Sequence, residues 1–105
     1  MKPLSYKIKT FRLLFPVILT AILGGCAHYD GGHLFHTEGC ITCHRFKGTG
    51  GGMGPDLTAV TARKSDSAIY NYLQNPKKYN PHARMPSFAR LSRSKRNAII
   101  AYLKK

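Results

Sequence analysis

The sequence has no tryptophan and only four acidic residues, against 17 lysines and arginines in 105 residues. The acids are Asp30, Glu38, Asp56 and Asp66. They form no carboxylate pair, and no nucleophile–base pair is visible, so the sequence predicts a protein that is not an enzyme. No segment alternates with a period of two, which excludes a substantial β-sheet. The longest charge-free apolar run, residues 13–23, is too short to span a bilayer comfortably.

Cysteine is also scarce, but two of the three cysteines belong to a Cys-x-x-Cys-His motif at residues 40–44. This spacing is the attachment signature of c-type haem, because two thiols one helical turn apart can each bond a vinyl group. A thioredoxin-type dithiol would need a βαβ setting, which is absent. A zinc site would need more ligands than His82, which alone follows His44. We therefore predict one haem c bound through Cys40 and Cys43, with His44 as the proximal iron ligand.

The N-terminal segment has the features of a bacterial export signal, with four cations before the apolar run. Leu23-Gly24-Gly25-Cys26 resembles a lipobox, whose cysteine is lipidated and becomes the mature N-terminus. We expect a lipoprotein signal peptide at 1–25, a tether at 26–32 and the domain at 33–105. Lipidated Cys26 would hold the domain on the periplasmic side of a bacterial membrane. The alternatives are an uncleaved membrane anchor, or a soluble periplasmic protein with a spare thiol.

Helical periodicity predicts an all-α domain. We expect helices at about 33–43, 66–74 and 93–104, the last two capped by Ser65 and Ser92. The glycine-rich segment 48–54 is predicted to be a loop that lets backbone pass close to the haem, since no strand or Lys-Ser/Thr supports a phosphate loop. Residues 75–91, with three prolines, are expected to be loop-like. The 80 residues from Cys26 onward are few for a self-sufficient core, so we expect the chain without haem to be largely unfolded.

The sixth iron ligand has three candidates. Met53 lies in the glycine loop, only ten residues past Cys43, whereas Met85 lies 41 residues past His44 in a Met-Pro-x-Phe context. The longer span lets the chain return on the opposite face of the haem, which favours Met85. His82 is the rival ligand, and it would lower the reduction potential relative to a thioether.

The chain from about residue 32 to residue 105 resembles the class I (mono-haem) cytochrome c family. The resemblance rests on the order of four motifs: Cys40-Ile41-Thr42-Cys43-His44, Gly54-Pro55-Asp56-Leu57-Thr58, Met85-Pro86-Ser87-Phe88 and Ala101-Tyr102-Leu103. It implies a fold of three to five helices around one covalent haem, with the N- and C-terminal helices crossing beside it. It also implies His44 and Met85 as axial ligands, and a hydrogen bond from the His44 imidazole to the Pro55 carbonyl.

The family often uses a tryptophan to bind a haem propionate, and this chain has none. Arg63, Tyr70, Tyr79 and Arg84 are candidate substitutes. The sequence does not choose among them.

The net charge is +13 for the whole chain. An exported haem protein would not normally meet nucleic acid, so we expect acidic redox partners, steered by charge, and a membrane surface. Arg93, Lys95 and Arg96 open the last helix, where the helix dipole disfavours cations, which suggests a functional patch.

The predicted function is one-electron transfer between membrane or periplasmic redox complexes by a monomeric carrier with His/Met ligation. A haem peroxidase or gas-binding protein with an open sixth site is the enzymatic alternative, which Met85 opposes. A fixed subunit of a larger redox complex is the other.

Overall fold

The computed structural model describes residues 27–105, so the predicted signal peptide and Cys26 lie outside the described part. The described elements, in chain order, are α2 (Gly31–Thr37), α3 (Cys40–Cys43), β1 (Arg45–Phe46), β2 (Thr49–Gly50), α4 (Val60–Arg63), α5 (Asp66–Gln74), α6 (Pro76–Tyr79) and α7 (Arg93–Leu103). Helices dominate, as predicted, and the two strands form one short antiparallel hairpin. The all-α fold is confirmed, and residues 27–105 contain six helices, of which α3, α4 and α6 are only four residues long.

The predicted helix at 33–43 is instead two helices, α2 and α3. Gly39 interrupts them with a φ of 82°, a left-handed conformation that is costly for any residue with a Cβ. The first helix also begins earlier than expected, at Gly31, because the Asp30 carboxylate accepts a hydrogen bond from the His33 amide at 3.1 Å. Gly31 and Gly32, expected at the end of the tether, are therefore helical.

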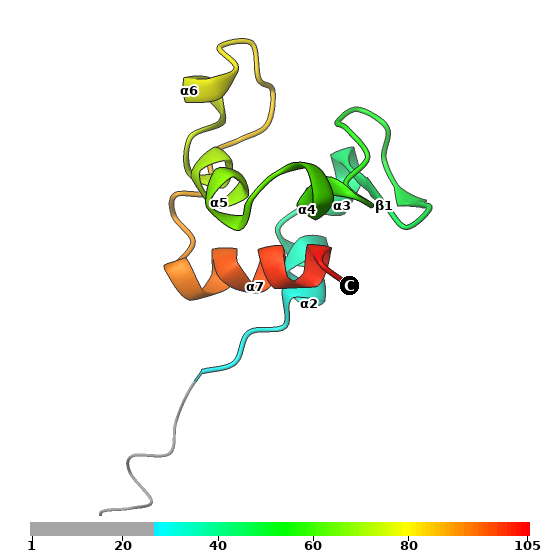
Figure 1. The fold of residues 1–105 in the computed structure, drawn as a ribbon, viewed down its shortest axis with the longest axis vertical. Helices are drawn as coiled ribbons and strands as arrows, with labels where there is room; N and C mark the ends of the chain where they lie inside the picture. The colour runs from blue at the N-terminus through cyan, green and yellow to red at the C-terminus, as the bar shows by residue number, and fades with distance from the viewer. Residues whose placement is uncertain (1–26) are drawn as a thin grey trace, which may run out of the picture.

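The crossing of α2 and α7 forms one side of the core. A Cβ on Gly31 would lie 1.9 Å from the Ala98 carbonyl oxygen, so only glycine allows the two backbones to come this close. Phe35 is fully buried at the crossing, and its ring lies 5.6 Å from that of Tyr102. The predicted crossing of terminal helices is thus present, and Figure 1 shows α7 running across α2.

The helices α5 and α7 match the sequence prediction closely. Ser65 and Ser92 accept hydrogen bonds from the amides of Ala68 and Lys95, at 3.2 and 3.3 Å, and so cap the two helices. The short helices α4 and α6 were not predicted. An asparagine cap followed by proline starts α6. The Asn75 side chain accepts a hydrogen bond from the Lys78 amide, and Pro76 suits the first helical position because it has no N–H that would be left unpaired there.

Arg96 is buried, with 5% of its surface exposed, which corrects the expectation that it belongs to a surface patch. Its guanidinium donates to the carbonyls of Phe88, Ala89 and Leu91 at 3.1, 3.1 and 2.6 Å, and to the Tyr70 hydroxyl at 2.7 Å. It also lies 4.7 Å from the centre of the Tyr70 ring. Arg96 therefore joins α7 to α5 and to the loop before α7.

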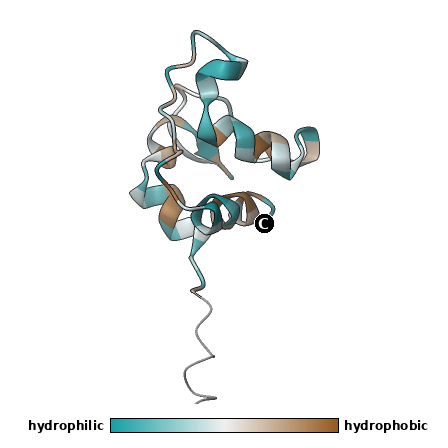
Figure 2. Ribbon diagram, turned by 90° about the vertical axis from the view of Figure 1, so that its left-hand side faces the viewer, coloured by the Kyte–Doolittle hydropathy of each residue, from teal (hydrophilic) through white to brown (hydrophobic). Residues whose placement is uncertain are grey.

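Buried apolar residues of these elements form one core cluster. In Figure 2, hydrophobic (brown) stretches alternate with hydrophilic (teal) ones along the helices. No helix between residues 27 and 105 combines the length and the apolar character needed to cross a membrane.

Candidate functional site

A cavity of about 850 Å³ lies among α3, α5, α7 and the loops that carry Pro55 and Met85. Its walls are mainly apolar, with Phe35, Leu57, Ile69, Leu73, Phe88 and Leu103 among them. A volume of this size matches sites that enclose a large organic ligand.

Both motif cysteines line the cavity from α3. They are half-buried and free, three residues apart on one turn of helix. Burial raises the pKa of the Cys40 thiol to about 11. The helix ends at His44, whose extended backbone turns the chain away while its amide still donates to the Cys40 carbonyl at 2.9 Å. The imidazole is thereby placed directly after the two thiols on the same cavity wall.

The orientation of the His44 ring is fixed by the glycine loop. His44 Nδ1 lies 2.8 Å from the Pro55 carbonyl oxygen. A carbonyl can only accept, so Nδ1 carries the proton and Nε2 keeps a free lone pair for a metal. A Cβ on Gly54 would lie 2.5 Å from the His44 Cε1 atom, so the loop can pass the ring only with glycine here.

The glycine loop approaches α3 and His44 closely, which refines the expected role of these residues. The Gly51 amide donates to the Ile41 carbonyl at 3.0 Å, and the Gly54 amide to the Cys43 carbonyl at 2.7 Å. These bonds fill carbonyl positions that a one-turn helix leaves unpaired. The glycine loop therefore packs against the backbone of α3 and against His44, and it helps to fix the position of the cysteines and of the imidazole.

Met85 also lines the cavity, half-buried, on the loop between α6 and α7. The backbone after it is held on two sides, since the Phe88 amide donates to the Leu73 carbonyl at 2.8 Å and Ser87 Oγ to the Gln74 carbonyl at 2.5 Å. Arg96 binds the same loop from α7. Met85 is thus on a segment fastened to α5 and α7 rather than on a free loop.

The competing ligand candidates are placed differently. Met53 is at the cavity wall but has 73% of its surface exposed. His82 is exposed and is not part of the wall, and its amide donates to Asn80 Oδ1 at 3.1 Å. The three histidines before the motif, His28, His33 and His36, are also exposed and outside the wall.

The candidates for propionate binding are partly separated by the structure. Tyr70 bonds Arg96, and Arg63 donates to the Asp56 carbonyl at 3.3 Å; neither belongs to the cavity wall. Tyr79 and Arg84 do line the cavity.

Two further residues of the wall were missed. Lys64 is in the wall, and Tyr72 stacks on Tyr79 with ring centres 5.9 Å apart. The two tyrosines lie on different helices, α5 and α6, with the non-helical Asn75 between them, so no spacing in the sequence indicated that they would stack.

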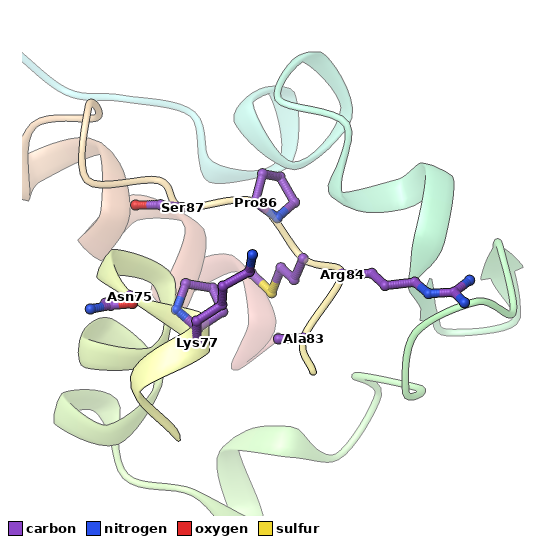
Figure 3. Close-up of a pocket in the computed structure, with 8 residues that line it drawn as sticks. Asn75, Lys77, Ala83, Arg84, Pro86 and Ser87 are labelled. Atoms are coloured by element: carbon purple, nitrogen blue, oxygen red, sulfur yellow. The ribbon is translucent and has the colours of Figure 1, made fainter. Parts of the chain in front are cut away.

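A shallower groove of about 580 Å³ lies on the outer side of the Met85 loop, between this loop and the start of α6. Figure 3 shows the Arg84 side chain extending away from Lys77, so the two cations do not converge on one point. The groove therefore does not bring two cations together to bind an anion. Its importance is that it leaves the Met85 loop open to solvent.

The residues around the main cavity fit a haem c. Two thiols stand one helical turn apart, the next residue is a histidine with a free Nε2, and a thioether lies in the same cavity. The walls supply the apolar enclosure that a porphyrin needs.

Comparisons with known proteins agree with this geometry. The family model for cytochrome c matches residues 29–105. The chain is 35% identical to a cytochrome c of Gibberella zeae over 96 residues, which cover 70% of this chain and 89% of the relative. It is 34% identical to a cytochrome c of Arabidopsis thaliana, covering 70% of this chain and 83% of the relative. A cytochrome c of Cochliobolus lunatus is also 34% identical, with 70% and 86% covered.

Proposed function

Since the chain belongs to the cytochrome c family, and is therefore an electron carrier with haem c bound through Cys40 and Cys43, we propose that it works on the periplasmic side of a bacterial membrane. Lipid on Cys26 would hold it there, and it would pass single electrons, as a monomer, between membrane or periplasmic redox complexes. The observation that carries the electron-transfer function is the cavity in which two thiols, a histidine and a methionine meet.

The protein residues have separate tasks in this function. When bound, haem supplies one-electron chemistry between the ferric and ferrous states of iron. Cys40 and Cys43 hold the group in place, His44 Nε2 is available for the metal, and Pro55 fixes the ring tautomer through its carbonyl. The apolar walls keep water away, so the environment changes little when the charge of the site changes.

We assign Met85 as the distal ligand. The support is that Met85 shares the cavity with His44 and lies on a segment bound to α5 and α7, whereas His82 lies outside the wall. A methionine thioether as iron ligand would also favour the ferrous over the ferric state.

The ligand assignment is tested with the spectrum of the oxidised protein, which should contain a weak methionine–iron band. Met85→Ala should abolish this band and open the site to carbon monoxide, while Met53→Ala should change neither. Rapid, complete carbon monoxide binding to the unmutated ferrous protein would favour a gas-binding protein instead.

The lipid anchor and the location rest on the sequence. The support is a charged segment, an apolar run of eleven residues and Leu-Gly-Gly-Cys at 23–26. Mass spectrometry of the protein extracted from its membrane should find an acylated Cys26 as the first residue. Cys26→Ala should remain in the membrane only if the N-terminal segment is an uncleaved anchor, and that result would overturn the proposal.

We further propose that the partners carry acidic docking surfaces. The support is the distribution of cations near the cavity: Lys77, Lys78 and Arg84 are exposed on α6 and the Met85 loop. Glu38 and Asp66, by contrast, are paired with Arg90 and Lys104. Electron transfer to a membrane complex should slow as salt rises from about 10 to 500 mM, because screening shortens the reach of these charges. An unchanged rate would refute electrostatic steering.

A further inference from the structure

The point at which the chain leaves the domain is fixed by the crossing of α2 and α7. The backbone at Gly31 lies against the Ala98 carbonyl, and a Cβ on Gly32 would lie 3.0 Å from the Tyr102 ring. Just before the helix, the Asp30 carbonyl accepts from the Leu34 amide at 3.0 Å, and its carboxylate accepts from the His33 amide. Residue 30 therefore has a defined place against the outer side of the helix pair.

The preceding residue is also held. The Lys95 ammonium lies 5.4 Å from the centre of the Tyr29 ring, and 36% of the Tyr29 surface remains exposed. Only Ala27 and His28 separate Tyr29 from Cys26. Three residue steps of about 3.3–3.6 Å each give a backbone reach of roughly 10 Å between Tyr29 and Cys26, so a lipid-bearing Cys26 would keep Tyr29 close to the bilayer surface.

The residues around this exit point suit a lipid surface. Lys95, Ala98, Tyr102 and Lys105 follow one another at spacings of three and four, so they lie along one stripe that begins in α7 and continues just past its end. The middle of the stripe, Ala98 and Tyr102, is covered by α2. Lys95 lies beside Tyr29 and Lys105 near Asp30, so both lysines are close to the exit. Within residues 27–105, the acidic residue at the exit is Asp30, whose carboxylate caps α2 and faces Lys105, so the exit carries two lysines against one carboxylate.

We infer that the flank of the α2–α7 pair carrying Tyr29, Lys95 and Lys105 lies against the anionic headgroups of the membrane. This inference rests on the proposed anchor at Cys26. Lysines near such a surface are attracted by it, and a tyrosine with an exposed edge is suited to the headgroup region. In Figure 1, residues 27–30 leave the domain beside α2 and α7, on the side away from α5 and α6.

This orientation determines which surface meets a partner. With the α2–α7 flank on the lipid, α6 and the open Met85 loop face the aqueous side, where Lys77, Lys78 and Arg84 are exposed. A tether of about 10 Å also prevents the domain from exploring space far from the bilayer. The partner is therefore a water-exposed, acidic domain of a complex in the same membrane.

The orientation is tested with the holoprotein beginning at Cys26. Because haem occupies Cys40 and Cys43, Cys26 is the remaining thiol, and it can be coupled to a maleimide-bearing lipid in vesicles that contain phosphatidylglycerol. Lysine acetylation rates are then measured by mass spectrometry, on vesicles and free in solution. We expect Lys95 and Lys105 to be acetylated about fivefold more slowly on the vesicles, and Lys77 and Lys78 to be unaffected.

Three variants separate the effect of the tether from that of the lysines. A ten-residue Gly-Ser insertion after Ala27 should abolish the protection on phosphatidylcholine vesicles but only weaken it on phosphatidylglycerol vesicles. With the lengthened chain left uncoupled from lipid, Lys95→Ser with Lys105→Ser should weaken its co-sedimentation with phosphatidylglycerol vesicles about fivefold per lysine, whereas the matched change Lys77→Ser with Lys78→Ser should not.

The orientation would be overturned if the ratio of the acetylation rate on vesicles to that in solution were the same for all four lysines. It would also be overturned if Lys77 and Lys78 were the protected pair. The chemical coupling does not require the cell to acylate Cys26. A failure of the anchor would appear separately, as an unmodified Cys26 in protein taken from its own membrane.

Discussion

Replacing Arg96 with leucine should destabilise the folded haem protein by about 3–5 kcal/mol. The guanidinium is buried without a carboxylate partner, and backbone carbonyls surround it. Its removal leaves the Leu91 carbonyl without a donor, and a buried acceptor left unpaired costs about 1–3 kcal/mol. It also removes one of the two donors of the Phe88 carbonyl, a loss of about 0.5–1.5 kcal/mol, because the Leu91 amide still binds that carbonyl at 3.0 Å. The lost contact with the Tyr70 ring adds about 1 kcal/mol.

The measurement is guanidinium chloride unfolding of the holoprotein, followed by circular dichroism. Arg93→Leu is the matched control, because Arg93 is exposed in the same helical turn and only approaches the Tyr70 ring, at 5.9 Å. Its loss should cost less than about 1 kcal/mol. Arg96→Lys keeps the charge but concentrates its donors at one point, so it should fall between the two.

A second readout concerns the segment that Arg96 holds. Residues 88–91 follow Met85 directly, so the weak methionine–iron band should fade at a lower denaturant concentration in Arg96→Leu than the circular dichroism signal does. If Arg96→Leu costs no more than Arg93→Leu and leaves this band unchanged, the reasoning about the buried guanidinium is wrong.

Three other changes test the fold and the site. Gly31→Ala should destabilise the protein by at least about 3 kcal/mol because its Cβ would overlap the Ala98 carbonyl, while Gly52→Ala, with open space around its Cβ, should be nearly neutral by the same unfolding assay. Gly54→Ala should displace the His44 ring, which a changed Soret spectrum would reveal; an unchanged spectrum would contradict the packing of Gly54 on that ring. Hydrogen bonds from the Thr58 hydroxyl and amide hold the pKa of Asp56 below its ordinary value, so their stabilisation is present above about pH 4 and is lost as the pH falls further. The free energy of unfolding should therefore fall less steeply with decreasing pH in Asp56→Asn than in the unmutated protein. Equal slopes would mean that Asp56 does not contribute to the pH dependence of stability.

Local signals in the sequence predicted the parts of the fold that depend on neighbouring residues. Ser65 and Ser92 cap the helices they were expected to cap, because a capping bond joins residues three apart. The break at Gly39 was missed since helical periodicity continues across it, and only the φ of 82° reveals the turn. The motif at 40–44 could be recognised because its spacing reflects the geometry of the cofactor rather than of the chain, and Met85, the ligand predicted from its distance to His44, lies in the same cavity wall.

The buried position of Arg96 could not be predicted in the same way. A basic residue in the first turn of a helix is usually exposed, and the groups that bind it are carbonyls of an irregular loop, which leave no mark in the sequence. The exit of the chain beside Lys95 and Lys105 likewise depends on how closely α2 and α7 cross. Sequence patterns therefore specified the chemistry of the site, whereas the contacts that hold the site depend on tertiary packing.

The cavity leads us to expect that folding depends on cofactor attachment. Without haem, apolar walls such as Leu73 and Phe88 would face water instead of a porphyrin. The 79 residues from Ala27 onward are few for a core that lacks this contact. A chain with Cys40→Ala and Cys43→Ala, prepared without haem, should therefore show little helical circular dichroism and no cooperative melting. A compact apo chain that melts cooperatively would mean that α2, α5 and α7 form a sufficient core by themselves.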